Sequence, residues 1–414
     1  MTLARRSAIY AALGAAGLLV GVGLSEPALT AIGAALLAPL VYGLATAVPS
    51  PPVIGVRAPQ TRVLEGARIE LEITVSAEEP LSWVEVELDI PKRLRLSAGE
   101  RTRVLSLARA ERRTLDYTID CARWGAYPLA TLQLRASGVL AIRTVVDVHR
   151  AESVVRVYPR VEQLRRLVAP RTTRPASGSR PAALRGEGIE FSELRPLVAG
   201  EHARRINWRA SAARGRLFVS DRHPERSSEI VLFLDSLTAA ETADESTLDY
   251  AVRAAAALAR SYLHRRDRVG LLRFGGDLEW VLPGSSARQL YQVIDALLDS
   301  ETAKTYRWRN AALIPRRVLP PHSLVVALTP LIDWRVTRAL LNLRRRGFDL
   351  AVIEVEPIEF AAGERRRFGE LVWRMWLLDR DATRSRFAAA GVPVARWNPH
   401  QPITAAVEAL ERRR

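Results

Sequence analysis

Acidic and basic side chains lie close together between Arg185 and Arg226, and they are the first candidates for chemistry in this sequence. Glu187 and Glu190 are three positions apart. Two carboxyl groups this close could do general acid–base work if their environments hold them in different protonation states. Arg185 and Arg195 flank the pair, so a structural ion-paired arrangement competes with catalysis, and we favour the structural one. The alternative is an enzyme of unknown reaction that uses the acids and arginines of residues 187–216.

Other reactive side chains lack the spacing that catalysis or metal binding requires. The six histidines show no metal-ligand spacing, and neither a P-loop nor a dinucleotide-binding fingerprint occurs. Ser211 lies between two alanines and is not on a nucleophile elbow. Cys121 is in phase with apolar strand residues, which predicts a packed thiol. We therefore expect no catalytic residue, no cofactor and no enzymatic activity.

The stretch from Arg185 to Arg226 shows little hydrophobic periodicity, so we expect no ordinary helix or strand within it. Its aromatic and aliphatic residues nevertheless indicate order, because a disordered linker would mostly lack them. We predict a structural clasp that packs against the first strand of the domain that follows, with Phe191 and Trp208 as buried anchors.

Two motifs in this stretch match a known family signature. The first comprises Gly186, Gly188, Glu190, Phe191, Leu194, Arg195 and Pro196, and the second Gly200, Arg204, Ile206, Trp208, Ala210, Ser211, Ala212, Gly215 and Leu217. In this order they resemble the signature of the domain-of-unknown-function 58 family, G-x-G-x-E-F-x-x-L-R-x-Y followed by G-D-x-x-R-x-I-D-W-x-A-S-A-R-x-G-x-L. Leu197, Glu201 and Asn207 depart from it mildly.

We take ten of these positions as candidate interaction residues: Gly188, Glu190, Phe191, Arg195, Gly200, Arg204, Ile206, Trp208, Ser211 and Gly215. The resemblance implies a partner protein, a MoxR-type AAA+ ATPase, and a shared role in the assembly or maturation of a complex. We therefore predict a non-enzymatic interaction or scaffold protein.

Residues 229–235 form an almost continuous apolar run that ends in Asp235, as a buried parallel strand does when its carboxyl end opens onto a site. Together with the later run 267–274, this order resembles a von Willebrand A domain. In that family the first strand ends in D-x-S-x-S, and a later threonine and aspartate complete a magnesium site. Here Leu237 and Ala239 replace the two serines, and Thr329 is the candidate threonine. Because too few oxygens remain to replace the hydration shell of the ion, we expect a degenerate site without magnesium.

The amino-acid composition argues against some functions and cellular compartments. The net charge is +16, but the basic residues are nearly all arginines spread over every segment, which argues against a nucleic-acid partner. A single cysteine rules out an internal disulfide framework and suits a reducing compartment.

Two apolar runs, 7–24 and 28–48, are separated by a short turn with one acid. Each has about the ~20 residues that a membrane-spanning helix needs. Arginines on the outer flanks predict a transmembrane hairpin with both ends inside. A secretory signal peptide is the rival interpretation, but cleavage would strand the second run. We therefore expect contact with the lipid bilayer through residues 7–48 and a location at the inner or plasma membrane, with the remaining domains facing the cytoplasm.

The spacing of apolar residues changes twice along the rest of the chain. Alternating apolar residues, such as those of 69–75 and 115–121, predict an all-β sandwich, and strands alternating with helices after residue 229 predict a doubly wound α/β domain. The predicted fold is thus multi-domain. Its parts are a transmembrane α-hairpin over 1–50, a β-sandwich over 51–150, a connector with the signature over 151–228 and a von Willebrand A-like domain over 229–414.

Overall fold

The computed structural model divides the chain into two compact units, Met1–Arg160 (unit 1) and Val161–Arg414 (unit 2). It describes residues 2–3, 5–45, 50–91, 93–137, 143–151, 153–171, 190–198, 206–223, 228–302, 314–315 and 319–414.

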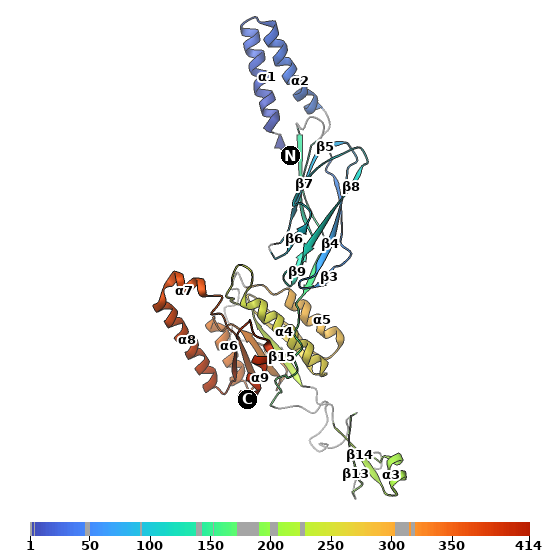
Figure 1. Ribbon diagram of the computed structural model, residues 1–414, viewed down its shortest axis with the longest axis vertical. Coiled ribbons are helices and arrows are strands. Elements are labelled where there is room, and N and C mark those ends of the chain that lie inside the picture. Colours follow the sequence, from blue (N-terminus) through green and yellow to red (C-terminus); the bar gives the residue numbers. More distant parts are fainter. Residues whose placement is uncertain are drawn as a thin grey trace. The chain divides into compact units, whose positions relative to one another are not determined.

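Unit 1 begins with the short strand β1 (Thr2–Leu3) and an antiparallel pair of helices, α1 (Arg5–Gly23) and α2 (Pro27–Ala45) (Figure 1). Glycines let the two backbones approach closely. A Cβ placed on Gly33 would lie 2.6 Å from the backbone nitrogen of Leu18, and one on Gly21 would lie 2.5 Å from that of Thr30. The two helices therefore pack against each other through small residues.

These helices correct the prediction of a transmembrane hairpin. Among the residues that the structure describes, none of the helices combines the length and the apolar character of a membrane span. α1 is 19 residues long and includes Arg5 and Arg6, which leaves fewer uncharged residues than the ~20 that a span needs. α2 is also 19 residues long and contains Pro39. The predicted transmembrane hairpin is therefore wrong.

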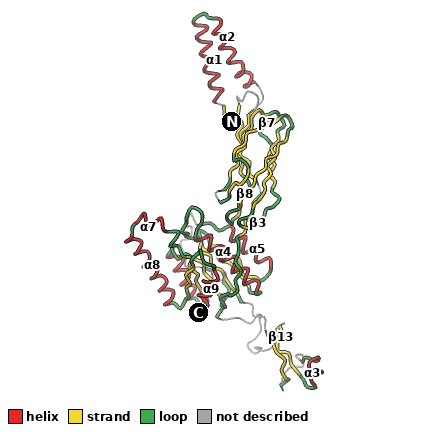
Figure 2. The backbone as a smooth tube through the Cα atoms, in the orientation of Figure 1, coloured by secondary structure: helices red, strands yellow, loops and turns green. Residues whose placement is uncertain are grey.

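The remainder of unit 1 is a β-sandwich (Figure 2). Its strands are β2 (Val53–Arg57), β3 (Arg62–Leu64), β4 (Arg68–Ser76), β5 (Leu81–Asp89), β6 (Arg95–Ala98), β7 (Thr102–Leu107), β8 (Arg112–Asp120), β9 (Gly125–Pro128), β10 (Thr131–Ser137), β11 (Arg143–Arg150) and β12 (Val154–Tyr158). They form a five-stranded sheet of order β1-β11-β10-β5-β7, a four-stranded sheet of order β2-β4-β8-β6 and a small sheet of order β3-β12-β9.

The sandwich core follows from the two-residue period of its strands. Ile73 on β4, Val86 on β5 and Leu134 on β10 belong to one buried cluster, whereas their neighbours along each strand face outward. Cys121 lies in this cluster, and burial raises the pKa of its thiol to about 11. The prediction of a packed thiol is confirmed.

Unit 2 contains a small motif built from strands β13 (Glu190–Pro196) and β14 (Phe218–His223) and the short helix α3 (Trp208–Arg214). The two strands pair antiparallel. Regular structure here corrects the expectation that the signature stretch holds neither helix nor strand. The hydrophobic period misled because these elements are short: α3 has 7 residues and β14 has 6, too few to show a clear period.

The larger part of unit 2 is a six-stranded sheet of order β17-β16-β15-β18-β19-β20. Its strands are β15 (Glu229–Asp235), β16 (Arg268–Phe274), β17 (Leu278–Gly284), β18 (Leu324–Thr329), β19 (Asp349–Val355) and β20 (Val394–Trp397). All neighbours are parallel except β17, which pairs antiparallel with β16 at one edge.

Helices cover both faces of this sheet (Figure 1). They are α4 (Thr247–His264), α5 (Ala287–Leu298), α6 (Trp334–Arg345), α7 (Ala362–Phe368), α8 (Glu370–Ala389) and α9 (Ile403–Arg413). Phe233 on β15 shares a buried cluster with Leu340 on α6 and Phe387 on α8. Its neighbours Leu232 and Leu234 point to the opposite face, because side chains alternate along a strand.

Residues 161–171 also belong to this unit. Leu167 and Val168 are buried, and the carbonyl oxygen of Val168 accepts a hydrogen bond from the buried hydroxyl of Tyr262 at 2.8 Å. The backbone N–H of Arg171 donates to Asp349 at 2.8 Å, and that of Ile403 donates to Glu162 at 3.1 Å. This segment is therefore fixed along the α/β part of unit 2.

Candidate functional site

The carboxyl ends of β15 and β18 mark the place where the strand order reverses. From β15 the chain passes through α4 to β16 on one side, and from β18 it passes through α6 to β19 on the other. Open α/β sheets bind ligands in the crevice outside such a switch point. Asp235 is the last residue of β15 and Thr329 the last of β18, so both lie at this position.

Asp235 is held tightly at the switch point. One carboxylate oxygen accepts a hydrogen bond from the hydroxyl of Thr329 at 2.6 Å, and the other accepts one from the backbone N–H of Leu237 at 3.0 Å. Only 2% of Asp235 is exposed. Burial raises the pKa of this carboxyl to about 7, although both hydrogen bonds act to lower it. Asp235 therefore joins two strand ends and does not face solvent.

The residues around Asp235 do not fit a magnesium ion of the von Willebrand A type. Leu237, at the first hydroxyl position of that motif, is part of the buried core, and Ala239 offers no oxygen from its side chain. Thr329 donates to Asp235, and its hydroxyl also accepts from the backbone N–H of Leu331 at 2.9 Å. Because both side chains already bond to each other, they present few lone pairs to a cation.

Beside the switch point, α6 begins with a cluster of polar groups. Asp333 caps the helix and accepts from the backbone N–H of Arg335 at 2.8 Å and from its Nε at 2.9 Å. Thr238 donates to the same carboxylate at 3.4 Å. Burial acts to raise the pKa of Asp333, but the hydrogen bonds and the charge of Arg335 outweigh it and lower the pKa overall. Trp334 stands between these two residues with 66% of its surface exposed.

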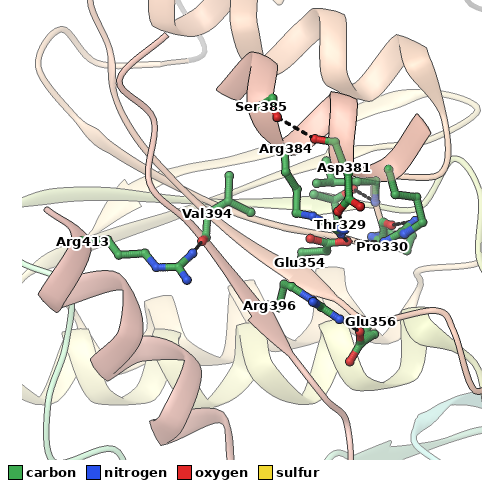
Figure 3. Close-up of polar contacts among 12 residues, drawn as sticks. Thr329, Pro330, Glu354, Glu356, Asp381, Arg384, Ser385, Val394, Arg396 and Arg413 are labelled. Carbon is green, nitrogen blue, oxygen red and sulfur yellow. Dashed lines mark hydrogen bonds and ion pairs between the residues drawn. The ribbon is translucent and has the colours of Figure 1, made fainter. Parts of the chain in front are cut away.

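A buried ion cluster lies at the end of the neighbouring strand. Glu354 on β19 is paired at 2.8 Å with Arg384 of α8 (Figure 3). It is also paired with Arg380 of the same helix. Arg380 also donates to the carbonyl oxygen of Pro330 at 3.0 Å. Glu354 and Arg380 are almost fully buried, so α8 is fixed to the carboxyl edge of the sheet by charges that have little access to water.

The structure gives several signature residues a structural role. The hydroxyl of Ser211 donates to the carbonyl oxygen of Asn207 at 2.8 Å and accepts from the backbone N–H of Phe218 at 2.9 Å. The side chain of Asn207 caps α3, and Gly215 ends it with a φ of +65°, which favours glycine. These residues join α3 to β14, as does Ile206 through a bridge to Val219.

Other signature residues differ from expectation or cannot be placed. Trp208 is 66% exposed, so its predicted role as a buried anchor is wrong. Gly188, Gly200 and Arg204 lie outside the described residues. The backbones of Glu190, Phe191 and Arg195 lie on β13, and the structure does not describe their side chains. The assignment of these positions to partner binding stays a prediction.

Sequence reasoning did not identify Trp334 or the cluster of Glu354, Arg380 and Arg384. One signal was available for the cluster. Glu354 interrupts the apolar run of β19 close to the end of a buried strand, and a buried carboxylate requires partners. The sequence gives no sign that Trp334 is exposed. Trp334 is the first residue of α6, and other apolar residues of that helix are buried.

Residues 193–360 match the family model described as "Protein of unknown function DUF58". This part of the chain is therefore similar to the DUF58 family. The DUF58 match begins within β13 and includes β15, β18 and β19, so it contains Asp235, Thr329, Trp334 and Glu354. It ends before α8, which supplies Arg380 and Arg384.

Comparison with solved structures adds no functional information. The cupredoxin domain of amoB from Nitrosocaldus yellowstonii is 11% identical, with a TM-score of 0.21, and the match covers 33% of this chain and 99% of that domain. The GH20 exo β-N-acetylglucosaminidase from Vibrio harveyi is 9% identical, with a TM-score of 0.19, and covers 73% of this chain and 82% of its own. Likenesses this weak carry no argument. No protein with a curated description matches the chain.

Proposed function

We propose that this chain is a non-enzymatic interaction protein that binds a protein partner at the carboxyl edge of its six-stranded sheet. The observation that supports this most directly is Trp334, which is 66% exposed beside the switch point. Tryptophan and arginine are the residues most enriched at the energetic centres of protein interfaces, and Arg335 lies next to it.

The state of the neighbouring polar groups favours binding over catalysis. A general base must reach the proton that it removes, and a nucleophile must reach its substrate. Asp235 is buried and bonded to Thr329, Asp333 is bonded to Arg335, and Glu354 is buried between arginines. Each of these groups stabilises the edge on which Trp334 is presented.

The family resemblance suggests which partner to test first. Members of the DUF58 family resemble one another in the signature stretch, and that resemblance implies a MoxR-type AAA+ ATPase as partner in the assembly or maturation of a complex. We adopt this partner as part of the proposal. We also retain the relation of residues 229–414 to von Willebrand A domains, in which the carboxyl edge of the sheet is the binding face.

A binding experiment with two exposed tryptophans tests this proposal. Purified full-length chain and a MoxR-type ATPase from the same genome are combined, and affinity is measured by fluorescence anisotropy of the labelled ATPase. We expect Trp334→Ala to weaken binding about tenfold or more, as central aromatic residues of interfaces do. Trp280→Ala is the matched control, because Trp280 is 42% exposed on the edge strand β17. Equal affinity of the two variants, or no binding by the unmodified chain, would refute the proposal.

A further inference from the structure

The first two turns of α8 are apolar on every side. Seven of the eight residues from Leu371 to Leu378 are apolar, and the exception is Arg374. A helix that is hydrophobic all round is normally buried. Yet the side that does not face the protein is open to solvent, with Leu371 74%, Met375 62% and Leu378 67% exposed.

These exposed residues form one line. Leu371, Met375 and Leu378 are spaced by four and then three positions, and Val372 adjoins them with half of its surface exposed. We call these four residues the α8 stripe. A spacing of four and three places side chains along one seam of a helix, which is the pattern that packs against a second helix. Isolated exposed apolar residues need no explanation, but a continuous row of them marks an interaction surface.

The stripe is held on a rigid support. Further along α8, Arg380 and Thr383 are buried and Phe387 lies in the core shared with α6 and β15. Arg380 joins Glu354 on β19, and its guanidinium also lies 4.9 Å from the ring centroid of Trp376. The α8 stripe is therefore presented in one position rather than on a loose segment, which reduces the entropy lost on binding.

Charge indicates what the stripe binds. α7 and the first half of α8, residues 362–378, contain four arginines and two glutamates. Arg365 and Arg374 both pair with Glu370, so the carboxylate of Glu370 is already occupied. Arg366 and Arg367 are exposed and, within the described residues, form no ion pair. Asp379 adds a single acid at the far end. The α7 end of the stripe is thus basic and favours acidic groups on its partner.

From these observations we infer that the α8 stripe docks an amphipathic helix of a partner protein, whose apolar seam is flanked by acidic residues. This inference rests on the proposed role as an interaction protein but uses a second surface, because α8 lies beyond the DUF58 match. The α8 stripe thus lies outside the residues that match the family model.

A pair of synthetic peptides tests the inference with the full-length chain. Each peptide is a single helix of about three heptads with leucine at the seam positions, and the flanking positions carry glutamate in one and lysine in the other. We expect fluorescence anisotropy to show that the glutamate peptide binds about tenfold or more tightly than the lysine peptide. Added salt should weaken its binding, because the preference depends on charge.

Substitutions show whether binding uses the stripe. We expect Leu371→Gln with Met375→Gln to reduce affinity for the glutamate peptide about tenfold or more, and circular dichroism to be unchanged because both side chains are exposed. Leu282→Gln is the matched control, since Leu282 is 58% exposed on β17. Trp334→Ala should leave peptide binding unchanged. Failure of the proposed function would therefore appear in ATPase binding, and failure of this inference would appear in peptide binding.

Three outcomes would overturn the inference. Equal binding of the two peptides would remove the acidic helix as the occupant. Self-association of the chain that disappears in the double variant would identify a second copy as the occupant instead. Stripe-dependent binding to vesicles of anionic phospholipid, without binding to the glutamate peptide, would assign the stripe to a lipid surface.

Discussion

Replacing Glu354 by glutamine should destabilise the carboxyl edge of the sheet more than any other single removal of charge described above. Arg380 has only 4% of its surface exposed, and the substitution removes its counter-charge. Burial lowers the pKa of Arg380, and Glu354 is the main group that acts to raise it. Arg384 loses less, because it is partly exposed and also pairs with Asp381. Removing one partner of a buried ion pair costs about 3–5 kcal/mol.

Hydrogen–deuterium exchange of the full-length chain measures this cost where it arises. Because ~1.4 kcal/mol corresponds to a tenfold change, peptides from β18 and β19 should exchange about 100-fold faster or more in Glu354→Gln. Strands of unit 1 provide an internal reference that should not change. Glu356→Gln is the matched control, since Glu356 pairs with Arg396, which is half exposed (Figure 3). Loss of that pair should cost about 1 kcal/mol or less.

A second variant tests whether the loss of protection comes from the unpaired charge of Arg380. Glu354→Leu combined with Arg380→Met removes both buried charges, and such replacements are often neutral or stabilising. We expect it to restore most of the protection lost in Glu354→Gln. If Glu354→Gln and Glu356→Gln exchange alike, the buried cluster does not fix α8 to the sheet, and the rigid support of the α8 stripe is lost with it.

Three further predictions concern other parts of the chain. The melting temperature of the full-length chain should be the same with magnesium as with a chelator. A ligand that binds only the folded state would raise the melting temperature, so a magnesium-dependent rise would contradict the predicted degenerate site at Asp235. Because the folded pKa of Asp235 is raised from 3.8 to about 7, the folded state binds the extra proton between those values, and stability should fall as pH rises from about 4 to 7. Asp235→Asn should remove this contribution, by up to ~1.4 kcal/mol per pH unit, in urea unfolding at several pH values, and identical pH profiles would refute it. Ser211→Ala should lower the free energy of unfolding by about 1–3 kcal/mol and speed hydrogen exchange in β14, because the buried N–H of Phe218 loses its acceptor. Trp208→Ala should change exchange little, because Trp208 is exposed. A larger effect of Trp208→Ala than of Ser211→Ala would instead support Trp208 as a buried anchor.

The comparison of sequence and structure shows which signals are local. The strand from Glu229 to Asp235 has the predicted bounds, because a buried parallel strand is apolar on both faces and can be read without its neighbours. The capping box of Ser246 and Asp249 at the start of α4 is another local feature, because both partners lie within one helical turn.

Errors arose where the environment of a residue decides its role. Trp208 was expected to be buried because tryptophan is mostly apolar, yet the first position of a short helix leaves it exposed. Two apolar runs near the start resemble membrane spans in composition, but alanine, glycine and the flanking arginines give helices that fall short of a span. The role of Arg380 depends on Glu354, which lies 26 positions earlier, and no local pattern connects the two.

The fixed segment of residues 161–171 sets the order in which the chain can fold. Glu162 receives its hydrogen bond from the N–H of Ile403, which is 241 positions further along. Contacts between residues so far apart form slowly, because a long loop must close before they stabilise anything. During synthesis unit 1 can complete its sandwich as soon as Arg160 has left the ribosome. Unit 2 must instead wait for its last helix, and until then Leu167, Val168 and the apolar strands of its sheet are available to chaperones and to aggregation.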